Sequence, residues 1–358
     1  MNLLKNIAIR LFIISVLFAY CKKKTTPPTI PIPPIVEGDS TFINPLLNSG
    51  PDPWVFEKDS IYYYMHTLGN RIDIWKTKSM SNLKNASIKT VWIVPSTGSH
   101  SRNIWAPELH LINDKWYIYY TAGASDDLST QRTFVLENSS TDPLEGAWTD
   151  KGNIGDPAAN VFSIDGTILQ YKNKNYFIWS ANPSSIESKQ NIYIARMSNP
   201  WTLETPRSLL STSQYDWEKI GGSQWVNEGP EILQNSSGNI FLVYSASGCW
   251  TDDYALGLMA LQKESDPLLA ASWTKVPTPV FTKNPSGNAY GPGHNGFFKS
   301  PDNKEDWIIY HANSNTNEGC KDKRNPRIQK FTWKADGTPD FGSPLSINIP
   351  VKKPSGEQ

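Results

Sequence analysis

The chain has 358 residues, with 34 basic and 34 acidic side chains, so its formal net charge is zero. No basic stripe runs through residues 44–345, which argues against nucleic acid as a partner. Aromatic residues make up 12% of the chain, and 27 Pro and 23 Gly punctuate short apolar runs, a composition typical of a fold with many short strands.

The N-terminal residues 1–21 have the pattern of an export signal. Basic residues come first, and Leu11 to Tyr20 is then a nearly unbroken apolar run that is too short to span a bilayer as a helix. A run of this kind that ends at a single Cys, here Cys21, resembles a bacterial lipoprotein signal, although Tyr20 stands where a small residue is usual. The alternative is an ordinary secretory signal with an incidental Cys.

Both alternatives predict export, either to the bacterial periplasm or to the outer membrane as an anchored lipoprotein. In the second case the membrane contact is only the lipid on Cys21. Residues 22–43 are interpreted as a Pro-rich tether, because 25–36 is too rich in Pro for helix or sheet. Residues 44–345 are the predicted folded domain, and 346–358 the C-terminal tail.

Within the folded domain, a polar or charged residue precedes an aromatic-rich strand five times. These markers are Asp52, Glu108, Asp165, Glu228 and His294, at intervals of 56, 57, 63 and 66 residues. A repeat of that length holds about four short strands, and units that cannot bury their faces alone stack around an axis as propeller blades. The sequence therefore predicts an all-β fold, a five-bladed β-propeller, whose markers converge on a central active-site pocket.

The aromatic-rich strand of each repeat is a short run that follows a polar turn. These strands are expected at 61–66, 116–122, 176–180, 241–245 and 307–311, with third strands at 73–77, 191–195 and 256–260. The one weak helical signal, at 266–272, predicts about one turn. Four Trp residues late in the first four repeats are interpreted as blade packing: Trp92, Trp148, Trp201 and Trp273.

Two cysteines, Cys249 and Cys320, lie just after the aromatic-rich strands of adjacent repeats. In an exported protein an even pair suggests a disulfide. Whether their Cα atoms lie within bonding range does not follow from the sequence, so a bridge and two free thiols both remain open.

Five short motifs occur in order along the repeats. They are Pro51-Asp52-Pro53-Trp54, Ile104-Trp105-Ala106-Pro107-Glu108, Ile164-Asp165-Gly166-Thr167, Asn227-Glu228-Gly229-Pro230 and Gly291-Pro292-Gly293-His294-Asn295. Each motif alone is weakly specific, but the ordered set resembles glycoside hydrolase family 43 over residues 44–345. The resemblance implies a five-bladed propeller enzyme that cuts arabinose- or xylose-containing glycans with inversion at the anomeric carbon.

The resemblance also implies roles for three carboxylates. Asp52 matches the general base, Glu228 the general acid, and Asp165 the residue that orients the acid and raises its pKa. Inverting hydrolysis needs one protonated acid and one ionised base, so the environments must push their pKa values apart. The alternative interpretation makes Asp52 and Asp165 turn residues and Glu228 a solvated loop acid, with Glu231 as its rival.

Further residues are expected to bind substrate. Trp105 suits stacking on a sugar face, although it could be a core residue. The resemblance implies a pocket-facing Arg near Arg327, with a surface position, or Arg324 in its place, as alternatives.

The resemblance also places His294 where the family holds a cation, commonly calcium, through a His and waters. The other interpretation is a His that bonds Asp165 or substrate without metal. Calcium prefers oxygen ligands. We therefore expect no required cofactor, with Ca²⁺ near His294 as the candidate.

The residues 62–64, 103–110 and 226–230 are most similar to the α-L-arabinofuranosidases of the family. We expect a monomeric, exo-acting enzyme that removes terminal α-L-arabinofuranosyl residues from arabinan or arabinoxylan. The alternatives are a β-xylosidase, an endo-arabinanase or a galactan-acting enzyme. Outside catalysis, they are a surface glycan-binding lipoprotein and a protein-interaction propeller. The three carboxylates favour the enzyme, because a binding protein has no need to keep all of them.

Overall fold

The computed structural model describes residues 40–156 and 158–357. The predicted export signal, Cys21 and residues 22–39 of the predicted tether lie outside the described residues. None of the helices in the described part has the length and apolar character that crossing a membrane requires.

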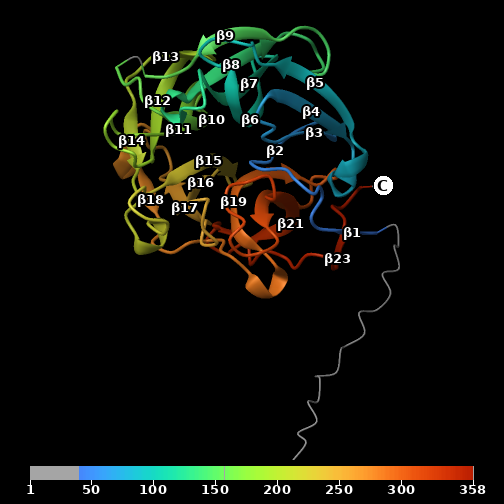
Figure 1. The fold of residues 1–358 in the computed structure, drawn as a ribbon. Coiled ribbons are helices and arrows are strands. Elements are labelled where there is room, and N and C mark those ends of the chain that lie inside the picture. The colour runs from blue at the N-terminus through green and yellow to red at the C-terminus, as the bar shows by residue number, and fades with distance from the viewer. Residues whose placement is uncertain (1–39, 157, 358) are drawn as a thin grey trace, which may run out of the picture. The chain divides into compact units, whose positions relative to one another are not determined.

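Five antiparallel sheets follow one another around a common centre, as Figure 1 shows in chain order from blue to red. Blade 1 is β2 (Trp54–Lys58), β3 (Ile61–Met65), β4 (Arg71–Thr77) and β5 (Ser87–Ile93), and blade 2 is β6 (Arg102–Ile112), β7 (Lys115–Gly123), β8 (Arg132–Asn138) and β9 (Thr149–Asn153). Blade 3 is β10 (Ser163–Tyr171), β11 (Lys174–Ala181) and β12 (Asn191–Asn199), with β13 (Thr202–Leu203) and β14 (Ser208–Ser211) both paired to β12. Blade 4 is β15 (Asn227–Gln234), β16 (Ile240–Ala246), β17 (Ala255–Leu261) and β18 (Trp273–Lys275), and blade 5 is β19 (Tyr290–Lys299), β20 (Asp306–Asn313), β21 (Asn325–Trp333) and β22 (Pro339–Asp340). The five-bladed β-propeller is therefore confirmed.

Short 3₁₀ turns connect some of the strands. They are η1 (Met80–Asn85), η2 (Leu128–Thr130), η3 (Asp216–Glu218), η4 (Ala270–Ser272) and η5 (Pro285–Gly287). The weak helical signal at 266–272 corresponds to the single turn η4. The five aromatic-rich runs are the second strands β3, β7, β11, β16 and β20, as expected.

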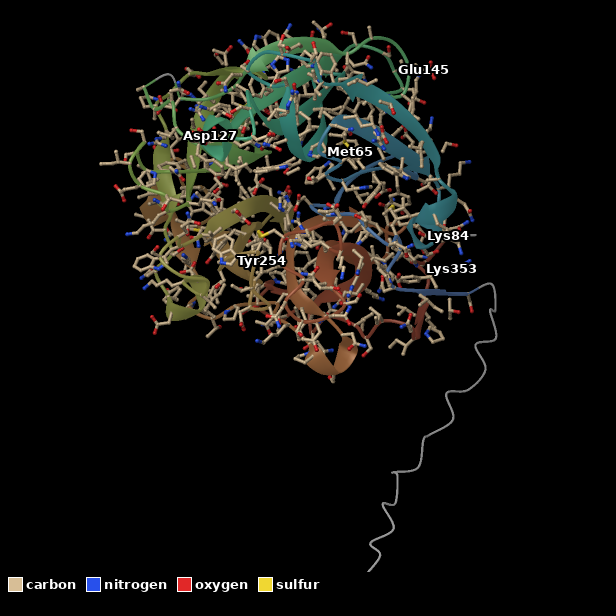
Figure 2. All side chains as sticks on the ribbon, in the orientation of Figure 1. Met65, Lys84, Asp127, Glu145, Tyr254 and Lys353 are labelled. Atoms are coloured by element: carbon tan, nitrogen blue, oxygen red, sulfur yellow. A yellow bond between two sulfur atoms is a disulfide. The ribbon has the colours of Figure 1, made fainter. Side chains whose placement is uncertain are left out.

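The hydrophobic core consists of five clusters, one in each seam between neighbouring blades. Aromatic rings meet across these seams, as between Tyr63 and Trp116, whose ring centroids are 5.6 Å apart, and between Tyr119 and Phe177 at 5.8 Å. Figure 2 shows side chains filling the space between the ribbons of adjacent blades. Most of the aromatic residues thus hold the blades together, which is the role that the sequence assigned to the late Trp residues.

The two ends of the described chain close the ring together. β1 (Thr41–Ile43) pairs antiparallel with β23 (Pro350–Lys352), and Phe42 packs into the seam between blades 5 and 1. The side-chain amide of Asn44 donates to the Ile328 carbonyl at 2.9 Å and accepts from the Ile328 N–H at 3.0 Å. It takes the place of a neighbouring strand along the part of β21 that β22 does not pair with.

The C-terminal segment reaches back to blade 1. The Glu357 carboxylate accepts hydrogen bonds from the Ser79 hydroxyl and the Met80 N–H, each at 2.7 Å, at the start of η1. Folded structure thus extends on both sides of the expected range 44–345, because the terminal segments pair with each other rather than with their neighbours in sequence.

Candidate active site

The first strands of the blades (β2, β6, β10, β15 and β19) contact one another around the axis. Each blade brings one residue there in the left-handed backbone conformation: Asp52 (φ 55°), Ala106 (43°), Asp165 (55°), Gly229 (50°) and His294 (46°). In β6, β10, β15 and β19 this residue lies in a β-bulge. Because a bulge bends the strand and redirects its side chains, the same local irregularity brings either this residue (Asp52, Asp165, His294) or the one before it (Trp105, Glu228) to the pocket.

The bulges correct the register of two sequence markers, because Gly229, and not Glu228, is the bulge residue of blade 4. Ala106, and not Glu108, is the residue of blade 2 that corresponds to Asp52 and Asp165. Glu108 lies beyond the bulge and pairs with Tyr119, just as Glu231 lies beyond the bulge of blade 4. Both glutamates are buried and are not among the pocket-lining residues, so Glu231 is not a rival of Glu228 in the pocket.

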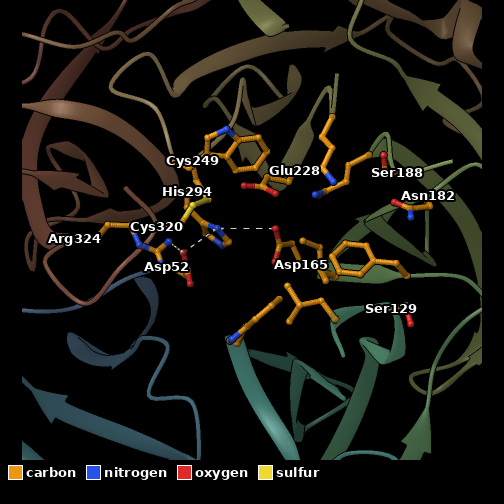
Figure 3. Close-up of a pocket in the computed structure, with 17 residues that line it drawn as sticks. Asp52, Ser129, Asp165, Asn182, Ser188, Glu228, Cys249, His294, Cys320 and Arg324 are labelled. Carbon is orange, nitrogen blue, oxygen red and sulfur yellow. Dashed lines mark hydrogen bonds and ion pairs between the residues drawn. A yellow bond between two sulfur atoms is a disulfide. The ribbon is translucent and has the colours of Figure 1, made fainter. Parts of the chain in front are cut away.

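Asp52, Asp165, Glu228 and His294 line one pocket of about 580 Å³, shown in Figure 3. Trp105 lines the same pocket, and its stacking on a sugar face stays a prediction. The other lining residues are Leu128, Ser129, Phe162, Ile164, Asn182, Ser188, Gln190, Gln224, Cys249, Trp250, Cys320 and Arg324. The volume is typical of a small-ligand site, and the mixture of aromatic and amide side chains suits a sugar.

Asp52 is held in its ionised form by an ion pair. Its Oδ1 lies 2.7 Å from Nη1 of Arg324, and its Oδ2 accepts a 2.7 Å hydrogen bond from the Thr67 hydroxyl. Burial alone would raise the pKa of Asp52, but the Arg324 charge and the Thr67 hydrogen bond help to bring it well below its usual value. The Asp52 N–H donates to Nδ1 of His311 at 3.0 Å, which fixes the left-handed backbone.

Glu228 has the opposite environment. Burial, with a contribution from the Asp52 charge, raises its pKa to about 7, although the Tyr254 hydroxyl, which donates to its Oε1 at 2.8 Å, acts to lower it. Asp165 accepts from the Gly229 N–H at 3.0 Å, and burial followed by the Glu228 charge raises its pKa well above the ordinary value. The pocket thus holds one carboxylate that stays ionised and two that retain a proton more readily than usual.

Gly229 shows why the motif around Glu228 needs a glycine. Its backbone is left-handed at φ 50°, and a Cβ there would lie 3.3 Å from the His294 ring and 3.4 Å from the Ser245 hydroxyl oxygen. A side chain would have to displace a pocket residue as well as adopt a strained conformation. Glycine at this position therefore allows the backbone N–H to donate to Asp165 directly beside Glu228.

Comparison with known proteins identifies the family. Residues 42–339 match the family model described as glycosyl hydrolases family 43. The chain belongs to this family. An extracellular exo-α-(1→5)-L-arabinofuranosidase of Streptomyces avermitilis is 37% identical over 321 residues, which are 87% of this chain and 66% of that protein. The chain therefore spans about two thirds of that relative's length.

Two further matches of the family 43 chain cover more of the other protein. A protein of the same name from Streptomyces chartreusis is 37% identical over 275 residues, or 76% of this chain and 82% of that protein. The crystal structure of an α-L-arabinofuranosidase from Lactobacillus brevis superimposes with a TM-score of 0.81 and 37% identity, covering 86% of this chain and 98% of that one.

The surroundings of His294 do not favour direct coordination of calcium. Its Nδ1 lies 3.4 Å from Oδ1 of Asp52 and 4.0 Å from Oδ2 of Asp165, and burial lowers the pKa of its imidazole. Arg324 already occupies Oδ1 of Asp52. The described residues include no group of three or more His, Cys, Asp or Glu placed to hold a metal. Because calcium takes roughly six to eight oxygen ligands, this donor set does not fit direct calcium coordination. Calcium bound at His294 through waters stays a prediction.

Arg324, rather than Arg327, is the arginine of the family 43 pocket. Arg327 is fully buried in β21, where it donates to the Asn325 side chain at 2.9 Å and to the Asn313 carbonyl at 3.2 Å. Arg324 lies just before the strand, lines the pocket and pairs with Asp52. The substrate-binding role predicted for Arg327 therefore has no support from its position.

Among the residues of this family 43 site that the sequence did not indicate, two lie in one loop. Tyr254 hydrogen-bonds Glu228, and Trp250 lines the pocket beside it. Both lie in the loop that follows Cys249, and Cys249 is bonded to Cys320, so the bridge left open by the sequence is present. The cysteine pair was the available signal, because it predicts that the loops after two second strands meet.

Proposed function

We propose that this family 43 protein is an inverting exo-α-L-arabinofuranosidase, with Asp52 as general base, Glu228 as general acid and Asp165 as the residue that tunes the acid. One observation carries the proposal: three buried carboxylates share a pocket in which Asp52 has a lowered pKa and Glu228 a pKa raised to about 7. Opposite shifts in one site are what acid–base catalysis near neutral pH requires.

The contacts support these roles. Asp52, kept ionised by Arg324, takes a proton from a water molecule that attacks the anomeric carbon. Glu228, still protonated near neutral pH, donates its proton to the glycosidic oxygen as that bond breaks on the opposite face. Asp165 accepts a hydrogen bond from the Gly229 N–H next to Glu228, and its own pKa is raised. The two carboxyl groups therefore lose their protons in coupled steps.

The arabinose specificity is supported by the relatives. The three similar proteins described above are all named α-L-arabinofuranosidases, and two of these are described as extracellular and exo-acting on α-1,5 linkages. We therefore propose terminal α-L-arabinofuranosyl groups of arabinan or arabinoxylan as the substrate, with Trp105 stacking against a sugar face.

The cellular location is part of the same proposal. Two relatives are extracellular by name, which supports export of this chain through residues 1–21. Lipidation of Cys21, anchoring in the outer membrane and a monomeric state remain predictions. Labelling with a radioactive fatty acid, with Cys21→Ser as the control, would test the anchor.

The direct test of the activity is a panel of aryl glycosides. We expect release of 4-nitrophenol from the α-L-arabinofuranoside and much slower release from the β-D-xylopyranoside. Reduced α-1,5-arabino-oligosaccharides would distinguish exo from endo action by yielding free arabinose first. NMR of the first product should show the inverted anomer. Binding of arabino-oligosaccharides without any release of arabinose would instead establish a glycan-binding propeller.

A further inference from the structure

The disulfide joins two loops from neighbouring blades. Cys249 lies in the blade-4 loop (residues 247–254), which connects β16 to β17, and Cys320 lies in the blade-5 loop (residues 314–324), which connects β20 to β21. Their Cα atoms are 5.3 Å apart, and both cysteines line the active-site pocket. Figure 3 shows the bridge close to His294, Asp52 and Arg324, so it forms part of the pocket wall.

Each loop ends in a side chain that touches one of the two reacting carboxylates. Tyr254, the last residue of the blade-4 loop, donates to Oε1 of Glu228 at 2.8 Å. Arg324, the last residue of the blade-5 loop, donates to Oδ1 of Asp52 at 2.7 Å. The bridge therefore connects the loop that contacts Glu228 with the loop that contacts Asp52.

Local contacts link the bridge to Arg324 on one loop and to the pocket wall at Trp250 on the other. Nε of Arg324 donates to the Lys321 carbonyl at 3.3 Å, and Lys321 directly follows Cys320. On the other loop, Nε1 of Trp250 donates to the Gly221 carbonyl at 3.0 Å, and Trp250 directly follows Cys249. A shift of either cysteine thus moves a residue whose contacts orient the pocket wall.

The rest of the contact between the loops is weakly protected. The Asn317 N–H donates to Oδ1 of Asp252 at 2.8 Å at an exposed position, and residues 315–317 and 321–323 are exposed to solvent. Segments with few buried contacts open at low free energy. The blade-5 loop is fixed at its end, where the Arg324 carbonyl accepts from the Gly50 N–H at 2.9 Å, but this contact does not hold the guanidinium.

We propose that the Cys249–Cys320 disulfide is a positioning element of the catalytic pair. It keeps Tyr254 on the acid and Arg324 on the base, and so maintains the spacing across which the water and the glycosidic bond must fit. The inference rests on the proposed function, which supplies the roles of acid and base. An inverting pair works only within a separation of roughly 6.5–9.5 Å, so a small displacement of either group lowers the rate.

A double-mutant cycle tests the proposal. Cys249→Ser/Cys320→Ser is compared with the parent chain, and the same pair of changes is made in a Tyr254→Phe/Arg324→Gln background. We expect removal of the bridge to lower kcat on the aryl arabinofuranoside about ten- to hundredfold in the parent. In the second background, where the positioned groups are gone, the same change should lower kcat less than about twofold.

The outcomes separate positioning from plain stabilisation. A bridge that only stabilises the fold would lower the melting temperature and leave kcat of the folded protein unchanged well below that temperature, and that result would overturn the proposal. So would equal losses of kcat in both backgrounds. If the parent chain releases no arabinose at all, the proposed function fails instead, and the two failures are distinguishable.

A second measurement covers the case in which the serine variant does not fold. The parent protein is reduced at 25 °C while far-UV circular dichroism follows the fold and thiol titration follows the bridge. Loss of kcat at constant ellipticity, recovered on reoxidation, supports the proposal. Full activity of the reduced, folded protein contradicts it.

Discussion

Removing the hydroxyl of Tyr254 should move the alkaline limb of the pH–rate profile to higher pH. That hydroxyl donates to Oε1 of Glu228 at 2.8 Å, and its bond stabilises the ionised carboxylate. A hydrogen bond to a charged group contributes about 1.5–3 kcal/mol, and one pKa unit corresponds to about 1.4 kcal/mol. Tyr254→Phe should therefore raise the pKa of Glu228 by about one to two units.

In the proposed mechanism Glu228 is the general acid, and this role sets the direction of the shift. Glu228 must be protonated to donate, so activity is lost as the pH rises through its folded pKa of about 7. A higher pKa keeps the acid protonated at higher pH. Because Asp165 and Glu228 are coupled, the limb reports the pair as a whole rather than one residue.

The assay is kcat as a function of pH with the aryl arabinofuranoside, which isolates groups in the enzyme–substrate complex. Tyr310→Phe is a matched control, because Tyr310 is also buried and its hydroxyl bonds Oε1 of Gln329 at 3.1 Å, outside the pocket lining. The control should keep the parent profile. An alkaline limb in Tyr254→Phe that stays in place, or moves to lower pH, would refute the reasoning.

Three further predictions concern the same site. Asp52→Asn and Glu228→Gln should each lower kcat by about 10²–10⁴-fold with an unchanged circular dichroism spectrum, whereas Asp59→Asn, on an exposed turn, should keep full activity. Glu228→Gln should lose less on substrates with an acidic phenol as leaving group, since these need little protonation, and an equal loss on all leaving groups would contradict the acid role. Arg324→Gln removes the charge that lowers the pKa of Asp52, so the acid limb of kcat/KM should move to higher pH; an acid limb unchanged in this variant would show that other groups keep the base ionised. Exhaustive chelation tests the calcium predicted near His294: because the donor set there does not fit direct coordination, we expect kcat to stay within about twofold, and a large loss restored by Ca²⁺ would show a functional cation held through waters.

The blade order and the pocket acids could be predicted because they depend on a local pattern repeated five times. Each marker lies in or next to the first strand of its blade, shortly before the aromatic-rich second strand, so the spacing alone indicated the ring. The position of Glu108 was misjudged because a bulge adds a residue to the strand, and the sequence does not reveal where the bulge lies. Ala106, with φ 43°, is the true counterpart of Asp52.

Arg324 and Arg327 show a second limit of the sequence. They are three residues apart at the start of β21, and only the location of the strand boundary decides which one reaches the pocket. Tyr254 is 26 residues from Glu228, and its contact depends on how the blade-4 loop is folded. The pairing of β1 with β23 joins opposite ends of the chain, for which no neighbouring residues give a signal.

The pairing of β1 with β23 affects how the propeller unfolds. A row of similar units that touch only their neighbours can fray from either end, one unit at a time. Here the first and last blades share a hydrophobic cluster and are joined by the β1–β23 strand pair. The Glu357 carboxylate also accepts a hydrogen bond from the Met80 N–H at the start of η1. Because of these contacts, neither terminal blade can unfold independently. Unfolding of the propeller should therefore be one cooperative transition and not a stepwise loss of blades.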